Sequence, residues 1–313
     1  MSAQDTATLP FDGPAIARAA AVIAAGGLVA IPTETVYGLA ARADQGAAVA
    51  AIYEAKGRPS FNPLIVHVAG LEQAERIARF DDRARALAAR FWPGPLTLVL
   101  PLRDDAPIAS LATAGLDTIA LRVPAHPAMR ALLAATGLPL AAPSANASGA
   151  ISPTRAEHVA ASLGGRIPLI VDAGPTALGL ESTIVRVTGD GVELLRPGPI
   201  TAEELDAVVP PDDGRITAPG QLASHYAPAK PLRLAATEAQ GDEYLIGFGS
   251  VKGDNNLSPS ANLAEAAANL FDFLHKADAA PQSAIAVAPI PETGLGAAIN
   301  DRLGRAAAPR SPS

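Results

Sequence analysis

The sequence contains no cysteine, and this absence excludes several classes of protein. Without thiols the 313-residue chain has no disulfide framework, no thiolate nucleophile and no zinc site that depends on cysteine sulfur. Its five histidines show no metal-ligand spacing. The absence of cysteine also fits a reducing compartment.

Long apolar segments are missing as well. The longest apolar run, residues 19–31, is shorter than the ~18 residues that a membrane-spanning helix needs, and Gly26 and Gly27 interrupt it. The first residues lack the basic and then apolar pattern of a secretory signal. We therefore expect a soluble, cytoplasmic protein.

Aromatic residues and positive charge are scarce. Phe, Trp and Tyr make up 4% of the chain, and the formal net charge is −7. This balance argues against a broad electrostatic grip on nucleic acid as the main activity, although it leaves room for a local basic pocket.

The common nucleotide and hydrolase signatures are also absent. There is no GxxxxGK[ST] P-loop and no GxSxG nucleophile elbow. The segment GFGSVKG at 247–253 approximates a dinucleotide fingerprint, but it has one residue too many and no helical pattern follows it promptly. It is more typical of a glycine-rich turn.

The pattern that is present over residues 1–210 is an alternation of short β-like runs with helical segments, which predicts an α/β domain with an open sheet. The expected strands are 28–32, 64–68, 96–100, 118–123, 138–142, 169–171 and 183–187. The expected helices are 14–25, 47–55, 82–90, 127–135, 153–163 and 202–208. Ser152 before Pro153 is interpreted as an N-cap, and Thr201 with Glu204 as a capping box.

A Pro/Gly/Asp-rich stretch at 210–224 interrupts this alternation. At ~15 residues it is long for a loop within one domain, so we interpret it as an interdomain linker. A smaller α/β unit follows, with strands expected at 232–234, 244–247 and 284–288 and helices at 263–276 and 295–308. The expected division is a large α/β domain at 1–210, a linker at 211–229 and a small Rossmann-like α/β domain at 230–313.

Lysine is rare, which makes one lysine informative. Only four of the 24 cationic residues are lysines, and Lys56 is the only one in the first 210 residues. It begins the segment KGRPSFNP at 56–63, just before an expected strand. A mobile ammonium and a planar guanidinium on a loop stiffened by Gly and Pro suit a polyphosphate. A solvated loop with incidental charge fits the composition equally well.

Three further segments place polar side chains at strand ends among glycines and prolines. They are PTETVYG at 32–38, PSANASG at 143–149 and GLEST at 179–183. Ligands of open α/β sheets gather outside strand ends, where short hydroxyl and amide side chains bind them. Taken singly, each segment is more typical of ordinary turn chemistry.

Together these segments resemble the threonylcarbamoyl-AMP synthase family. The matching residues are PTETVYGLAARA (32–43), KGRPSFNPLIVHV (56–68), FWPGPLTLVL (91–100), TIALRVPAHP (118–127), APSANASGAISPT (142–154), GLESTIV (179–185) and LLRPGP (194–199). PGQLASHYAP (219–228) resembles the segment that joins the two domains in the longer form of the family, and PIPETGLGAAINDRLGRAA (289–307) resembles its C-terminal domain. The resemblance covers nearly the whole chain.

The resemblance implies a twisted α/β fold with a large, positively charged cavity and a nucleotidyltransferase reaction. In that reaction L-threonine, bicarbonate and ATP give L-threonylcarbamoyl-adenylate and pyrophosphate. The product feeds a separate transferase that modifies the adenosine beside the anticodon of tRNAs. Such a reaction needs alignment and charge stabilisation rather than a covalent nucleophile. Mg²⁺ is expected through the ATP phosphates, with no dedicated carboxylate cage.

The resemblance also implies a role for each matching residue. Catalysis is assigned to Lys56 and Arg58. ATP binding is assigned to Arg58, Asn62, Thr118, Ser144, Ser152, Arg196 and Tyr226, and threonine binding to Thr35, His67, Arg122, the Ala142 backbone and Ser182. Asn146 is expected to support the site.

Three of these assignments have an alternative, and two of the three carry a specific expectation. Arg122 is the natural partner of the threonine carboxylate because a guanidinium pairs with it bidentately. Tyr226 lies in the linker, which is therefore expected to act as a lid. On spacing alone, His67 and Tyr226 are equally compatible with structural core positions and Arg122 with an ordinary strand-end arginine.

Other classes of function stay open at this point. Isolated first domains of this fold are linked to double-stranded RNA, so an RNA- or tRNA-binding protein without synthase activity is the main alternative, although the acidic balance and few aromatics do not favour it. A relative that uses carbamoyl phosphate would carry acylphosphatase-like and zinc-binding modules, which this sequence does not show. A dinucleotide-binding oxidoreductase would rest on the one imperfect glycine pattern.

Overall fold

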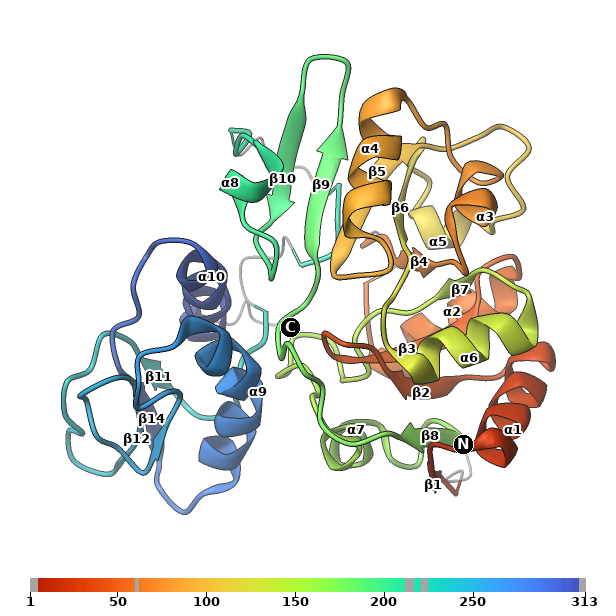
Figure 1. Ribbon diagram of the computed structural model, residues 1–313. Coiled ribbons are helices and arrows are strands. Elements are labelled where there is room, and N and C mark those ends of the chain that lie inside the picture. The colour runs from red at the N-terminus through yellow and green to blue at the C-terminus, as the bar shows by residue number, and fades with distance from the viewer. Residues whose placement is uncertain (1–4, 60–61, 212–216, 221–224, 310–313) are drawn as a thin grey trace.

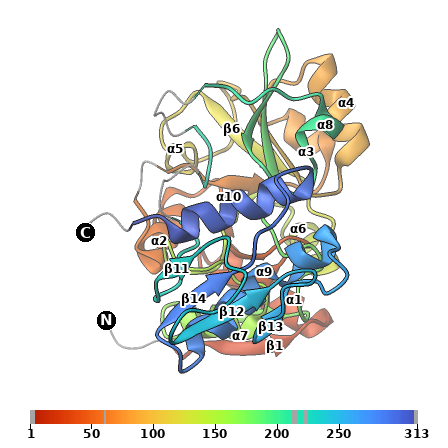
Figure 2. The same ribbon diagram turned by 90° about the vertical axis from the view of Figure 1, so that its left-hand side faces the viewer.

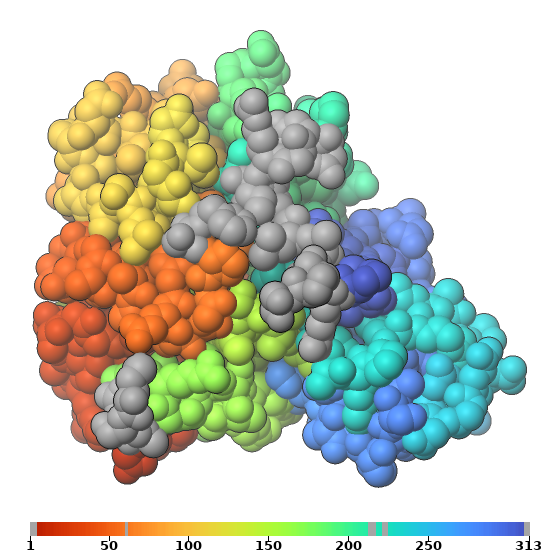
Figure 3. Space-filling view, turned by 180° about the vertical axis from the view of Figure 1, so that it is seen from behind, coloured from red at the N-terminus to blue at the C-terminus, as the bar shows by residue number. Residues whose placement is uncertain are grey.

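Two β-sheets organise the chain, a large one in the N-terminal half and a small one in the C-terminal half (Figure 1). The computed structural model describes residues 5–59, 62–211, 217–220 and 225–309. Seen from behind, the C-terminal half forms a lobe of its own beside the N-terminal half (Figure 3). No helix within these described ranges is long and apolar enough to cross a membrane.

The large sheet has ten strands in the order β1-β8-β2-β3-β7-β4-β6-β5-β9-β10. It mixes parallel pairs, such as β4 with β6, and antiparallel pairs, such as β5 with β6. The strands are β1 Ala7–Pro10, β2 Val29–Pro32, β3 Tyr37–Arg42, β4 Ile65–His67, β5 Leu96–Pro101, β6 Thr118–Arg122, β7 Leu140–Ala141, β8 Leu169–Asp172, β9 Thr183–Val187 and β10 Val192–Arg196. The expected open α/β sheet is confirmed.

Helices cover both faces of this sheet, because its central strands are apolar on both sides. Ile16 and Ile23 of α1 pack with Leu132 of α6 on one face, and Val49 and Ile52 of α2 contribute to the core on the other. The helices of this half are α1 Gly13–Ala24, α2 Gly46–Lys56, α3 Leu71–Glu75, α4 Asp82–Phe91, α5 Ser110–Thr113, α6 Pro127–Thr136, α7 Ala156–Leu163 and α8 Ala202–Leu205.

Two helix starts were predicted from capping residues, and the structure confirms one of them. Thr201 and Glu204 form the predicted capping box at the start of α8. The predicted N-cap at Ser152 is wrong, because α7 begins at Ala156 after Arg155. The Ser152 side chain instead donates to the carboxylate of Glu181. A tertiary partner therefore takes the hydroxyl that was expected to cap a helix.

The small sheet is entirely parallel, with the strand order β11-β14-β12-β13. Its elements are β11 Leu232–Arg233, β12 Glu243–Gly247, β13 Asn255–Asn256, α9 Leu263–Ala279, β14 Ala284–Val287 and α10 Leu295–Ala307. The segment 247–253 is a turn with Gly249 in the left-handed region (φ 57°), and α9 begins only at Leu263. The glycine-rich turn is thus confirmed over the dinucleotide fingerprint.

The two halves share a continuous apolar contact. Val36, Ile151 and Leu180 of the N-terminal half pack in the same core cluster as Tyr226 and the helices α9 and α10. Figure 2 shows α10 running across the middle of the molecule. Arg155, just before α7, donates to Asp272 of α9 at 2.8 Å. The C-terminal half is therefore fixed against the wall of the N-terminal half from which the polar strand-end segments emerge.

Candidate active site

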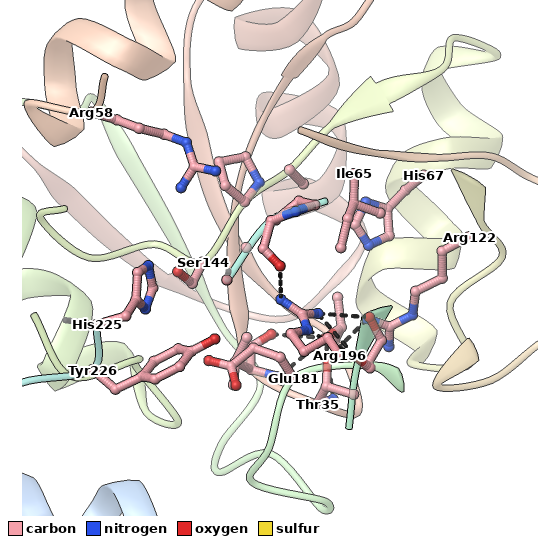
Figure 4. Close-up of a pocket in the computed structure, with 18 residues that line it drawn as sticks. Thr35, Arg58, Ile65, His67, Arg122, Ser144, Glu181, Arg196, His225 and Tyr226 are labelled. Carbon is pink, nitrogen blue, oxygen red and sulfur yellow. Dashed lines mark hydrogen bonds between the residues drawn. The ribbon is translucent and has the colours of Figure 1, made fainter. Parts of the chain in front are cut away.

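The polar strand-end segments meet at one cavity (Figure 4). The loop after β2 contributes Thr33, Thr35 and Val36, and the loop after β7 contributes Ala142, Pro143 and Ser144. Glu181 and Ser182 come from the segment before β9, and Pro219, Gly220, His225 and Tyr226 come from the linker. Segments far apart in the sequence thus form a single site.

Most of the predicted site residues line this cavity. They are Thr35, Arg58, His67, Arg122, Ala142, Ser144, Ser182, Arg196 and Tyr226. Five predicted residues do not line it, namely Lys56, Asn62, Thr118, Ser152 and Asn146.

Lys56 lies behind the loop that carries Ser144. Its Nζ donates to the backbone carbonyl of Ser144 at 2.6 Å and to that of Asn146. The Asn146 amide in turn donates to the carbonyls of Ala147 and Ala150, so it supports the same loop. Burial, reinforced by the nearby Arg58, holds the pKa of Lys56 well below its usual range.

Asn62, Ser152 and Thr118 occupy three different surroundings. Asn62 is fully buried, and its side-chain amide has no hydrogen-bond partner among the described residues. Ser152 is also fully buried and faces Glu181. Thr118 starts β6 opposite Pro101 and is partly exposed. Of the three, only Asn62 has a buried polar group left open for a ligand.

Three buried cations surround the cavity without a carboxylate partner in the described part of the chain. Among the described residues, Arg58 donates to the carbonyls of Asn62 and Pro63. Arg196 donates to Ser182 and to the Pro219 carbonyl, and Lys56 donates only to carbonyls. Burial lowers the pKa of Arg58 to about 10. Buried cations without a directly bonded carboxylate favour a multiply charged anion as the ligand.

The opposite end of the cavity is built by two neighbouring strands (Figure 4). Strands β4 and β6 are parallel and place His67 beside Arg122. Arg122 donates to Glu34 at 2.6 Å, to Thr35 Oγ1 at 3.0 Å and to the Gly94 carbonyl at 3.1 Å. With three of its five N–H groups so directed, it keeps donors for a ligand carboxylate.

His67 is neutral at physiological pH. Burial, assisted by the charge of Arg122, lowers its pKa to about 3. Neither ring nitrogen has a hydrogen-bond partner among the described residues. Its ring therefore offers one donor and one acceptor to a small polar ligand beside Arg122.

Tyr226 and His225 form the wall that the linker contributes. The Tyr226 ring packs against Phe271 of α9 with centroids 5.6 Å apart, and its hydroxyl has no partner among the described residues. Its φ of 63° places it in the left-handed region, which is rare for a non-glycine residue. The structure thus gives Tyr226 both properties that the sequence left open: a packed ring and a place at the cavity.

Sequence reasoning gave no role to three residues that the structure places at the site. Glu34 holds Arg122, Glu181 lines the cavity and His225 lies beside Tyr226. All three belong to the segments that match the family, so the sequence alone could have indicated their positions. Their ion pairs and ring contacts could not be predicted, because these contacts join segments that are distant in sequence.

Acidic residues are too few here for a metal cage. The described residues contain no group of three or more His, Asp or Glu side chains that could hold a metal ion. The one carboxylate that lines the cavity, Glu181, is bonded to Ser152 and Arg302. A divalent cation in this cavity would therefore depend on ligands that a substrate brings.

Comparisons with known proteins cover both halves of the chain. A family model described as "Telomere recombination" matches residues 21–198, and one described as "Threonylcarbamoyl-AMP synthase, C-terminal domain" matches residues 200–308. The Bacillus subtilis (strain 168) threonylcarbamoyl-AMP synthase is 43% identical, over 97% of this chain and 96% of its own. The Pyrococcus abyssi (strain GE5 / Orsay) enzyme is 41% identical, over 92% of each chain.

A solved structure agrees with these matches. The crystal structure of P. abyssi Sua5 complexed with L-threonine superposes with a TM-score of 0.87 at 38% identity, over 97% of both chains. The full-length form of HypF, at 18% identity and a TM-score of 0.52, shares the fold over 59% of this chain and 30% of its own.

Proposed function

Because this chain belongs to the threonylcarbamoyl-AMP synthase family, we propose how its residues divide the work of that reaction. The reaction is the synthesis of L-threonylcarbamoyl-AMP and pyrophosphate from L-threonine, bicarbonate and ATP. In our proposal residues 1–210 form the catalytic domain, 211–229 a linker that covers the cavity as a lid, and 230–313 a C-terminal domain. Linker residues 212–216 and 221–224 lie outside the described residues.

The triphosphate binds at the end of the cavity that carries Arg58, Ser144 and Arg196. The observation that carries this proposal is that Lys56, Arg58 and Arg196 are buried without a carboxylate partner in the described part of the chain. Asn62, with its open amide, and the Tyr226 hydroxyl contribute polar groups. Thr118 and Ser152 take part through the wall rather than by lining it.

Threonine binds at the opposite end. Arg122 takes its carboxylate, since the guanidinium retains free N–H donors beside Thr35. His67 and Ser182 take its remaining polar groups, with the backbone of Ala142 alongside. This arrangement directs the threonine amine toward Arg196 and the proposed phosphate end of the cavity (Figure 4).

The chemistry then requires two bond changes. The threonine amine takes up bicarbonate with loss of water to give a carbamate, and the ammonium proton is released to solvent. A carbamate oxygen bonds to the α-phosphorus while the bond from that phosphorus to the bridging oxygen of pyrophosphate breaks. Arg58, Arg196 and Lys56 neutralise the charge that develops on the phosphates, which is the main contribution of a protein to phosphoryl-type transfer.

Mg²⁺ enters with ATP in this proposal, bound to the phosphate oxygens. We infer that the unstable product passes to a tRNA-modifying transferase, and a cytoplasmic location fits this step. A weak direct contact with tRNA or double-stranded RNA remains an alternative to test, not a requirement of the mechanism.

The experiment is pyrophosphate release from ATP with threonine and bicarbonate omitted in turn. Release that depends on both supports the proposal, and Arg58→Ala should reduce it by at least about a hundredfold, the scale for one charge-stabilising group. Arg103→Ala, which removes an exposed arginine paired with Asp105, is the matched control. Release without threonine, or no release together with tight RNA binding, would overturn the proposal.

A further inference from the structure

Glu181 is an anomaly in a cavity proposed to bind a triphosphate. It lines the cavity beside Arg196 and Tyr226, and it is 6% exposed. A free carboxylate there would repel the phosphates and weaken nucleotide binding. Both of its oxygens are occupied, because Oε1 accepts the Ser152 hydroxyl and Oε2 accepts Arg302 Nε at 2.8 Å.

Arg302 reaches this carboxylate from the C-terminal domain. It lies on α10, 121 residues away from Glu181 in sequence, and its side chain is completely buried. It also donates to Asp301 at 2.6 Å and to the Pro197 carbonyl at 2.9 Å, and its guanidinium lies 5.1 Å from the Tyr226 ring centroid. A buried guanidinium with this many partners is rigidly held.

Arg302 remains charged in this position. Burial by itself would lower its pKa, but Tyr226, Glu181 and Asp301 outweigh burial and raise the pKa above its usual range. In the described part of the chain, Arg302 is the only cation that forms an ion pair with Glu181. The N-terminal half therefore contributes the anion, and the C-terminal half contributes its neutralising charge.

Building on the proposed function, we propose that Arg302 is a positioning residue for ATP binding: by neutralising Glu181 and fixing it against Ser152, it completes the wall of the nucleotide site. The C-terminal domain is then part of the synthase site, although none of its α10 residues lines the cavity. Its contribution is mainly to ATP affinity, because His67 and Arg122 of the proposed threonine site lie away from Glu181 and Tyr226 in Figure 4.

The test uses the full chain with Arg302→Met, Glu181→Gln and the double variant. In Arg302→Met the unpaired carboxylate should raise the Kd and KM for MgATP on the order of tenfold or more. The KM for threonine should change by less than about threefold, since no charge near Arg122 is altered. Removing the anion as well should restore most of the ATP affinity in the double variant.

Controls separate this role from a structural one. Arg233→Met removes an arginine of the same domain that is also doubly bonded to a glutamate, Glu243, away from the cavity, and ATP affinity should be unchanged. Glu181→Gln alone removes the anion and leaves Arg302 in place, so it should lose less ATP affinity than Arg302→Met. If Arg302→Met does not fold, Arg302→Gln takes its place, since it removes the same charge and keeps a polar side chain.

Three results would overturn the inference. They are unchanged ATP affinity in Arg302→Met, equal losses for ATP and threonine without rescue in the double variant, or an ATP loss in Glu181→Gln as large as in Arg302→Met. Wild-type pyrophosphate release that depends on threonine is measured alongside. If the wild type shows that release, such results reject the role of Arg302 only; if it does not, the proposed function itself fails.

Discussion

The carboxylate of Glu34 lies 2.6 Å from the guanidinium of Arg122, and the two side chains are 12% and 4% exposed. Its second oxygen accepts the backbone N–H groups of Ala125 at 3.0 Å and His126 at 3.2 Å, just before α6. Burial alone would raise the pKa of Glu34, but Arg122 lowers it below the usual value. The Glu34 carboxylate thus orients Arg122, the proposed threonine-binding arginine, and links it to the backbone that precedes α6.

Glu34→Gln should therefore impair threonine binding selectively. The amide has one acceptor oxygen instead of two, so either Arg122 or the backbone N–H groups lose their partner. We expect the KM for threonine to rise about tenfold and the free energy of unfolding to fall by about 3 kcal/mol, as for a broken buried ion pair. Steady-state kinetics and urea denaturation measure both.

Glu72→Gln is the matched control for that variant. Glu72 of α3 pairs with Arg76, the residue just after that helix, and their side chains are 89% and 68% exposed, so stability should change by less than about 0.5 kcal/mol. A KM for ATP that rises as much as that for threonine would contradict the assignment of Arg122 to the amino acid.

ATP binding should take up a proton at Lys56. The pKa of this lysine is held down by burial and by Arg58 while no anion is bound, and bound phosphates would raise it. Between those two pKa values the complex holds a proton that the free protein lacks, so ATP affinity decreases as pH rises through this interval.

Calorimetry in buffers of different ionisation enthalpy measures that proton. Lys56→Met should abolish the uptake and weaken ATP binding, whereas Lys252→Met, at an exposed lysine of the C-terminal half, should change neither. Equal proton uptake by the wild type and Lys56→Met would show that another group titrates.

His67 should make the protein less stable in mild acid. Its folded pKa is about 3, whereas in the unfolded chain it is about 6.5. Below about pH 6.5 the unfolded state therefore binds a proton that the folded state does not, and this histidine costs about 1.4 kcal/mol per pH unit as the pH falls toward 3.

His67→Gln removes that dependence while keeping a polar side chain. Urea denaturation at pH 7.5, 6 and 5 should show the wild type losing stability more steeply than the variant, with the two curves converging as the pH falls. Parallel curves would mean that His67 is not neutral in the folded protein. The variant should also raise the KM for threonine.

Gly220 should tolerate no side chain. It adopts a φ of 88°, and a Cβ there would lie 2.8 Å from the Tyr226 hydroxyl and 2.9 Å from Cδ of Arg196. Gly220→Ala should therefore displace two proposed ATP contacts and weaken ATP binding about tenfold, the scale for one or two displaced polar contacts. Isothermal titration with MgATP checks this.

Gly189 offers the control for that substitution. It lies between β9 and β10, and a Cβ there would meet no atom within 4 Å, so Gly189→Ala should bind ATP normally. Tight ATP binding by Gly220→Ala would argue that the linker does not cover the nucleotide.

Local chemistry explains which elements the sequence predicted. Segments such as Thr183–Val187 are rich in β-branched residues and bounded by turn residues. The sequence pattern therefore predicted a strand where the structure has one. Strand β3, Tyr37–Arg42, was not predicted because glycine and alanine have weak β-propensity. It is a strand because β2 and β7 pair with it on either side. Propensity was overridden there by tertiary contact.

By itself, the sequence determined the α/β class, the order of the polar segments and nine of the residues that line the cavity. These features are local: hydrophobic periodicity, turn residues and matched motifs lie within short stretches of chain. Only the tertiary structure decided that Lys56 lies behind the wall and that Ser152 faces Glu181. It also decided that Arg302 neutralises Glu181 across 121 residues. Burial and ion pairing are set by which segments meet, and no local pattern encodes that.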